Sequence, residues 1–188
     1  MPSPDRYTNT AITLHWLTFA LIAGGFSLAL YMVDLPLSPL KLKYFAWHKW
    51  TGVTVFLLVL TRIAWRLTHR PPALPPDMPR WQQRAAAATH LLLYALLVII
   101  PISGWLYSSA SGVPTVYFGV LPLPDLLTKD KALAAQLKSV HITLNYTLLA
   151  VVIAHVAAAL KHHFVERDAI LRRMLPCVKG RPGNPDHA

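Results

Sequence analysis

Four long apolar stretches dominate the chain, and shorter polar segments separate them. They cover about residues 11–33, 44–67, 85–108 and 139–162, and none contains an acidic side chain. A helix of about 20 apolar residues crosses a hydrocarbon core of about 30 Å. The pattern therefore predicts an all-α protein, a transmembrane four-helix bundle in which each stretch is one span. We expect residues 1–176 to form this single membrane domain and residues 177–188 to form a polar basic tail.

The composition excludes most water-soluble proteins. Hydrophobic residues make up 54% of the chain and charged residues only 14%, whereas a soluble domain averages about 25% charged residues. The apolar surface should therefore face membrane lipid. A formal net charge of +10 can indicate a nucleic-acid partner. Here the basic residues lie between the apolar stretches and not along one stripe, so no nucleic-acid partner is predicted.

The distribution of basic residues predicts the orientation in the membrane. One side of the predicted bundle carries twelve of them and the other carries six, and the richer side is expected to be cytoplasmic. Because the number of spans is even, both termini then lie in the cytoplasm. The twelve are Arg6, Arg62, Arg66, Arg70, Arg80, Arg84, Lys161, Arg167, Arg172, Arg173, Lys179 and Arg181; the six are Lys41, Lys43, Lys49, Lys129, Lys131 and Lys138.

Histidines within the spans are the most informative feature. Ionisable side chains are costly in a bilayer and usually functional, yet five lie in or at the ends of the spans: His15, His48, His90, His141 and His155. His141 and His155 are fourteen residues apart in one predicted helix. That spacing separates them by about 21 Å along the axis and turns them only about 40° away from a shared face. One helix could thus supply a ligand to two stacked sites.

Depth in the membrane predicts the partners of these two histidines. His15 and His155 lie near the cytoplasmic side, whereas His48 and His141 lie near the outer side. Facing histidines without a nearby cysteine or acid favour a six-coordinate b-type haem over zinc, which usually takes three or four ligands. The alternative is that the histidines only hydrogen-bond between helices.

Two further histidines leave alternatives open. His90 also lies near the inner end of its span, where it could replace His15 as the ligand, or could hydrogen-bond a haem propionate or a neighbouring helix. His162 follows His155 by seven residues and returns to the same face at the cytoplasmic boundary. It suits a proton-transferring quinone contact, and equally a solvated histidine at the interface.

The residues resemble those of the bacterial cytochrome b561 family over about positions 6–176. The resemblance rests on His15 with its neighbours in Thr13-Leu14-His15-Trp16, on His48-Lys49 with Gly52, on Arg62 to Arg66, on His90 to Tyr94 with Pro101 and Gly104, and on His141 with His155 to His163. No expected ligand histidine of the family is missing.

The resemblance implies a cytochrome of the bacterial inner membrane with two haem b groups that exchanges electrons with ubiquinone. Some members of the family are described as superoxide oxidases, in which superoxide reduces the outer haem and the pair of haems passes the electron to quinone. By the family's pattern, His162 is the residue on the quinone side. The fold also resembles membrane cytochrome subunits of hydrogenases or dehydrogenases, so a partner dehydrogenase is the alternative to a self-contained enzyme.

Charge near the outer ligands favours the enzyme with an anionic donor. Lys49 and Lys138 adjoin His48 and His141, and the outer segments carry six lysines against three acids, Asp34, Asp125 and Asp130. Such a field could raise the encounter rate with superoxide or another small one-electron donor. The alternative is that these lysines only extend toward lipid headgroups. A channel or transporter, as a third reading, leaves the paired histidines unexplained.

Overall fold

Four long helices make up the computed structural model, which describes residues 6–176. They are α1 (Asn9–Val33), α2 (Pro39–Thr68), α3 (Arg80–Ala110) and α4 (Lys131–Phe164). Each is long and apolar enough to cross a membrane. The prediction of an all-α protein with four spanning helices is therefore confirmed for this part of the chain. The predicted basic tail, residues 177–188, lies outside the described residues.

The helices extend beyond the predicted spans because polar caps, and not apolar residues, determine where they begin. The Ser38 hydroxyl accepts a hydrogen bond from the Lys41 amide at 3.3 Å, and Pro39 occupies the first helical position of α2. At the start of α4, Asp130 accepts from the amides of Ala132 and Leu133 at 2.8 and 3.0 Å. Hydropathy marks only the part of each helix that suits the bilayer.

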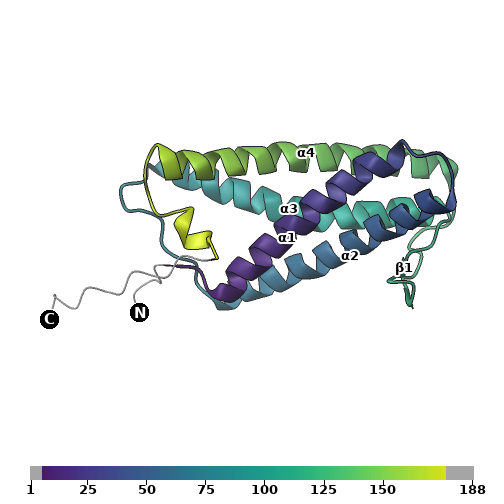
Figure 1. Cartoon of the computed structure of the whole chain (residues 1–188), viewed down its shortest axis with the longest axis horizontal. Coiled ribbons are helices and arrows are strands. Elements are labelled where there is room, and N and C mark those ends of the chain that lie inside the picture. The colour runs from purple at the N-terminus through teal and green to yellow at the C-terminus, as the bar shows by residue number, and fades with distance from the viewer. Residues whose placement is uncertain (1–5, 177–188) are drawn as a thin grey trace.

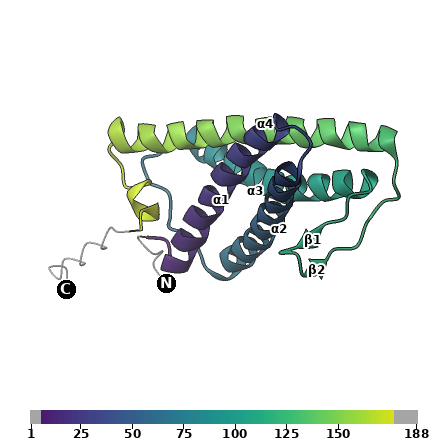
Figure 2. The same cartoon turned by 45° about the vertical axis from the view of Figure 1, so that its right-hand side comes forward.

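Consecutive helices run in opposite directions, so the bundle has two distinct ends (Figure 1). The terminal end contains the start of α1 and the end of α4, and the hairpin end contains the connection between α3 and α4. Close packing joins α1 to α2, α2 to α3 and α3 to α4. Helix α1 crosses the bundle obliquely, whereas α4 runs along its length (Figure 2).

A buried apolar layer occupies the middle of the bundle. It consists of side chains from α2, α3 and α4: Val55, Val59, Leu96, Leu97, Ile100 and Leu148. On α4 the layer residue Leu148 lies midway between His141 and His155, while the layer residues of α2 follow His48 and those of α3 follow His90. The layer therefore places hydrocarbon side chains between the two ends, and four of them, Val55, Leu97, Ile100 and Leu148, also line a cavity.

A two-stranded hairpin gives the hairpin end its name, and the sequence did not predict it. Strand β1 (Val116–Tyr117) pairs with β2 (Leu121–Pro122) in antiparallel fashion. Phe118 and Gly119 have φ values of 50° and 74°, as a tight turn with two left-handed residues requires. The Trp50 indole N–H donates to the Val116 carbonyl at 2.7 Å, which ties the hairpin to α2.

The segment after α4 folds back over the terminal end. A short 3₁₀ helix, η1 (Arg172–Met174), is held there by donors from two other parts of the chain. The Arg6 guanidinium donates to the Leu175 carbonyl at 2.6 Å, and the Trp16 indole N–H donates to the Met174 carbonyl at 2.8 Å. Arg173 donates in turn to the carbonyl of Ala73, in the connection between α2 and α3. We call these three contacts the terminal clasp.

Replacing the cap of α4 should destabilise the bundle without removing apolar contacts. Asp130→Ala removes the acceptor for two amide groups at the helix N-terminus, at a cost of about 1 kcal/mol. For a chain of this size we expect the thermal unfolding midpoint in detergent to fall by about 2–4 °C. Asp34→Ala is the matched control, since Asp34 sits at the C-cap of α1 where its charge opposes the helix dipole. Equal losses in both variants would contradict this role for Asp130.

Candidate functional site

At the hairpin end, two predicted site residues face each other across the bundle. His48 of α2 and His141 of α4 have ring centres 6.3 Å apart, with the ring planes at 87°. Both side chains are partly buried, and both line one cavity of about 630 Å³. The cavity has a mostly apolar wall from α1, α2, α3 and α4, and its volume is in the range that suits a bound cofactor.

Hydrogen bonds fix which nitrogen of each ring carries the proton. The Nδ1 atom of His48 lies 3.1 Å from the Gly25 carbonyl, which can only accept, so Nδ1 is the donor. The Nδ1 atom of His141 lies 2.9 Å from the Ser103 hydroxyl, whose own proton goes to the Ile100 carbonyl at 2.7 Å. Ser103 therefore accepts from His141. Both rings keep a free lone pair on Nε2, the atom that could bind a metal.

A glycine brings α3 close to His141. A Cβ atom on Gly104 would lie 3.0 Å from Cε1 and 3.3 Å from Nδ1 of that ring. Contacts this short require a neighbour to move, and the ring is already held by Ser103. Gly104 thus allows the close approach that the hydrogen bond from His141 to α3 needs.

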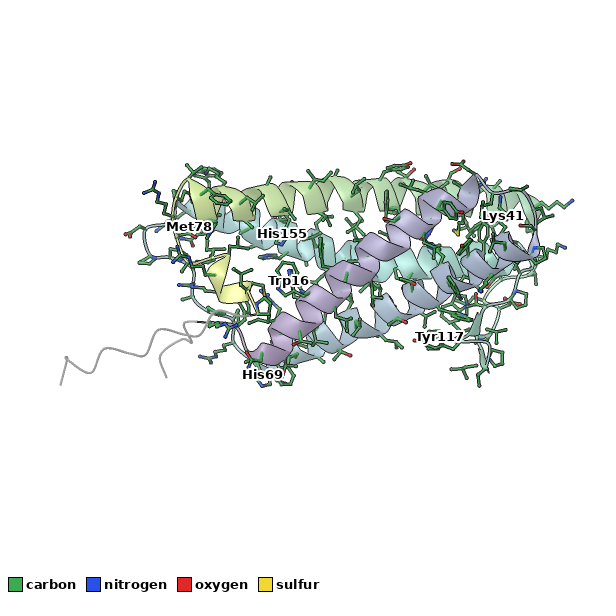
Figure 3. All side chains as sticks on the ribbon, in the orientation of Figure 1. Trp16, Lys41, His69, Met78, Tyr117 and His155 are labelled. Carbon is green, nitrogen blue, oxygen red and sulfur yellow. The ribbon has the colours of Figure 1, made fainter. Side chains whose placement is uncertain are left out.

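The terminal end brings together one charged or ionisable side chain from each helix. His15 of α1, His90 of α3 and His155 of α4 form a cluster, and Arg62 of α2 lies beside it. The ring centres of His15 and His155 are 6.4 Å apart, and those of His90 and His155 are 5.4 Å apart. Figure 3 shows His155 and Trp16 at this end of the bundle.

The ring separations indicate which histidines could share one metal ion. A bound imidazole nitrogen lies about 2 Å from the metal and about 1.2 Å from its own ring centre, so two rings on opposite sides of one ion have centres about 6.4 Å apart. The separation in the His48–His141 pair and in the His15–His155 pair matches this value. The 5.4 Å between His90 and His155 is too short for that arrangement.

His162 lies beyond this cluster, at the end of α4, and two carboxylates hold it. Its Nδ1 atom is 2.5 Å from Glu166 Oε2 and 2.6 Å from Asp168 Oδ2. Lys161 contacts the other oxygen of Glu166 at 2.7 Å, and this hydrogen bond lowers the pKa of Glu166. Gln82 of α3 also donates to Glu166, at 3.2 Å. His162 is thus a ring at the edge of the bundle with its Nδ1 fully engaged.

The two predicted catalytic lysines lie at the hairpin end, on different helices. Lys49 adjoins His48 on α2, and its ammonium group donates to the carbonyls of Val113 and Pro114 at 2.9 and 3.4 Å. Lys138 is exposed on α4, one helical turn before His141. Within the described residues, no hydrogen bond or ion pair joins the two lysines. Each lysine flanks a different histidine of the pair.

Several residues that the structure places at these sites were not predicted from the sequence. Ser103 and the Gly25 carbonyl bind the hairpin-end rings, but serine and glycine are common in membrane helices for packing reasons alone. The placement of Arg62 beside His15 was not predicted either, although an arginine seven residues inside the end of α2 is itself a functional signal. Glu166 stands four residues after His162, and that spacing could have indicated the contact.

Comparison with known proteins assigns the chain to a family. The family model for prokaryotic cytochrome b561 matches residues 6–177. Cytochrome b561 homolog 2 of Escherichia coli (strain K12) is 34% identical over 180 residues, which cover 92% of this chain and 93% of the relative. Cytochrome b561 homolog 1 of the same strain is 30% identical over 176 residues, with 92% and 98% covered.

A further relative is named for an activity. The probable superoxide oxidase CybB of Yersinia pestis is 28% identical over 179 residues, which cover 93% of this chain and 98% of the relative. The family match and the two relatives at 30% identity or more extend over nearly the whole chain. With its four membrane-spanning helices and the partly buried histidines between them, the protein belongs to the prokaryotic cytochrome b561 family.

Proposed function

We propose that this membrane cytochrome binds two b-type haems, takes electrons from superoxide at the hairpin end and delivers them to ubiquinone at the terminal end. Membership in the cytochrome b561 family implies haem b and a role in membrane electron transfer. The observation that carries the two-haem proposal is the pair of equal separations, 6.3 Å for His48–His141 and 6.4 Å for His15–His155. Each matches two imidazoles on opposite sides of one iron.

The chain's own residues fit this cofactor best at the hairpin end. His48 and His141 would hold the iron there, because Gly25 and Ser103 accept their Nδ1 protons and leave Nε2 free. The cavity that both rings line offers apolar walls for the macrocycle. When bound, haem supplies reversible one-electron chemistry at iron.

At the terminal end we assign His15 and His155 as the residues that would hold the iron. His90 is the competing candidate, and its 5.4 Å separation from His155 is too short for opposite coordination. Its position beside His155 suits a hydrogen bond to the cofactor. Since His141 and His155 both belong to α4, that helix would link the two haems across the apolar layer.

Positive charge supports an anionic donor at the hairpin end. Lys49 and Lys138 flank the His48–His141 pair, and the bond from Lys49 to the loop carbonyls holds its ammonium group at this end. Positive charges at this end raise the local concentration of a small anion such as superoxide. The relative named as a probable superoxide oxidase supports the same substrate. The hairpin end would face outward in the bacterial inner membrane, with both termini in the cytoplasm.

His162 is the residue we assign to ubiquinone. It lies seven residues after His155 on α4, at the terminal end, so a quinone there would be near the His15–His155 haem. Reduction of ubiquinone to ubiquinol takes two electrons and two protons. Glu166 and Asp168 contact His162 and reach the water boundary, which suits a histidine that takes up protons from that side.

A second candidate is a relay subunit that exchanges electrons between quinone and a separate hydrogenase or dehydrogenase. The β1–β2 hairpin favours it, because Phe118 and Val120 at its tip are 60% and 83% exposed. Apolar residues that project from one end of a membrane bundle suit a contact with a partner protein. Such a subunit would turn over no substrate alone.

The proposed ligand pairs predict separate losses of haem. His141→Ala is expected to leave one haem per chain at the terminal end, and His155→Ala one haem at the hairpin end. Haem is measured by the spectral difference between dithionite-reduced and air-oxidised purified protein. His90→Ala is the matched control and should keep both haems. If His90→Ala lost a haem while His15→Ala kept two, the assignment of His15 would be wrong.

The proposed substrate predicts a charge-dependent reaction of the purified protein alone. Superoxide should reduce its haems, and Lys49→Glu with Lys138→Glu should slow this about tenfold at low salt, with the difference shrinking as salt screens the field. Lys138→Glu alone tests charge without breaking the loop contacts of Lys49. Lys129→Glu with Lys131→Glu is the control for equal charge change farther from the histidines. Haems that superoxide leaves oxidised, but that a copurifying dehydrogenase reduces, would favour the relay subunit.

The proposed quinone contact predicts that replacing His162 slows only one step, the reoxidation of the haems by ubiquinone. In His162→Ala, superoxide should still reduce the haems at the wild-type rate, whereas reoxidation by added ubiquinone should slow at least tenfold. Stopped-flow absorbance follows both steps. His163→Ala changes the neighbouring histidine and should leave both rates unchanged. A slower first step in His162→Ala would mean that the substitution disturbs the haems themselves.

A further inference from the structure

Arg62 stands out among the residues that the proposed reaction does not yet use. It projects from α2 into the terminal-end cluster, where it is half-buried. Its guanidinium lies 3.2 Å from Nδ1 of His15 and 5.4 Å from the centre of the Tyr94 ring. It is thus a permanent positive charge, within a membrane-spanning helix and directly beside a proposed iron ligand.

No negative charge of the described residues balances Arg62. None of the four helices contains an acidic residue. Within residues 6–176, the ion pairs join only Lys161 and His162 to Glu166 and Asp168, at the end of α4. Burial raises the pKa of Tyr7, which is close to Arg62, so this phenol also stays neutral. An arginine in a membrane interior without an anion is costly.

The contact with His15 cannot persist when that ring binds iron. A guanidinium has only donors, so Nδ1 of His15 is the acceptor and, in a neutral ring, Nε2 carries the proton. Iron binding through Nε2 requires the proton on Nδ1, as in His48 and His141. Arg62 must then give up His15 and needs another acceptor nearby.

We propose that Arg62 binds a propionate carboxylate of the terminal-end haem and that its charge makes this haem the more easily reduced of the two. The proposal rests on the haem sites of the proposed function. Propionates are the anionic groups of haem b, and guanidinium with carboxylate forms the strong two-bond pair that an uncompensated arginine requires. An unpaired propionate would favour the oxidised iron, which has one positive charge more; Arg62 cancels that negative charge and so favours the reduced iron. Electrons would then move toward the terminal end.

A redox titration of the purified protein with its haems tests the effect of the charge. At a fixed potential, Arg62→Gln should lower the ratio of reduced to oxidised terminal-end haem about tenfold, a shift of about 59 mV for one electron. The hairpin-end haem should not change, and Arg62→Lys, which keeps the charge, should recover most of the shift. Arg66→Gln is the matched control, one turn farther along α2 and exposed. Single-haem variants, His141→Ala and His155→Ala, identify which haem is which.

A second experiment tests the propionate and needs no substitution at Arg62. In the His141→Ala background, haem-depleted protein is offered haem or haem dimethyl ester, whose propionates carry no charge. The protein should bind haem at least tenfold more tightly than the ester, and Arg62→Gln should remove most of this preference. Equal binding of haem and ester, or an unchanged potential in Arg62→Gln, would overturn the proposal. A wild-type protein that binds no haem at all would instead refute the proposed function.

Discussion

Hydrogen bonds that join the paired histidines to other helices are the constraint on which the rest of this bundle depends. At the hairpin end, α2 and α4 supply the rings, while α1 and α3 supply the acceptors, the Gly25 carbonyl and the Ser103 hydroxyl. At the terminal end, α1, α3 and α4 each supply a histidine and α2 supplies Arg62. Neither cluster can form unless all four helices are at their correct depth and rotation.

The two clusters also explain why the middle of the bundle is apolar. Val59, Leu97 and Ile100 are nearly inaccessible and carry no polar side-chain atom. The layer therefore offers no side-chain hydrogen-bond donor or acceptor that could carry a proton from one polar cluster to the other.

Much of the fold could be predicted because the bilayer imposes it. The length of an apolar helix and the depth of a histidine along it follow from residue spacing alone, and these predicted both the four helices and the two ring pairs that the structure brings together. Depth could not distinguish His15 from His90, which lie at the same level; in the structure their ring centres differ in distance from that of His155, at 6.4 Å and 5.4 Å. The β1–β2 hairpin is too short to leave a periodic signal. The contact of Arg62 with His15 depends on the rotation of α2 against α1, which hydropathy does not encode.

The terminal clasp differs from the histidine clusters in what it demands of the sequence. Its donors are the side chains of Arg6, Trp16 and Arg173, but every acceptor is a main-chain carbonyl, at Leu175, Met174 and Ala73. A carbonyl is present whatever side chain the residue carries. Substitutions at the three acceptor residues should therefore leave these hydrogen bonds in place as long as the backbone keeps the same path. Only the three donor residues, Arg6, Trp16 and Arg173, must keep a side chain that donates a hydrogen bond.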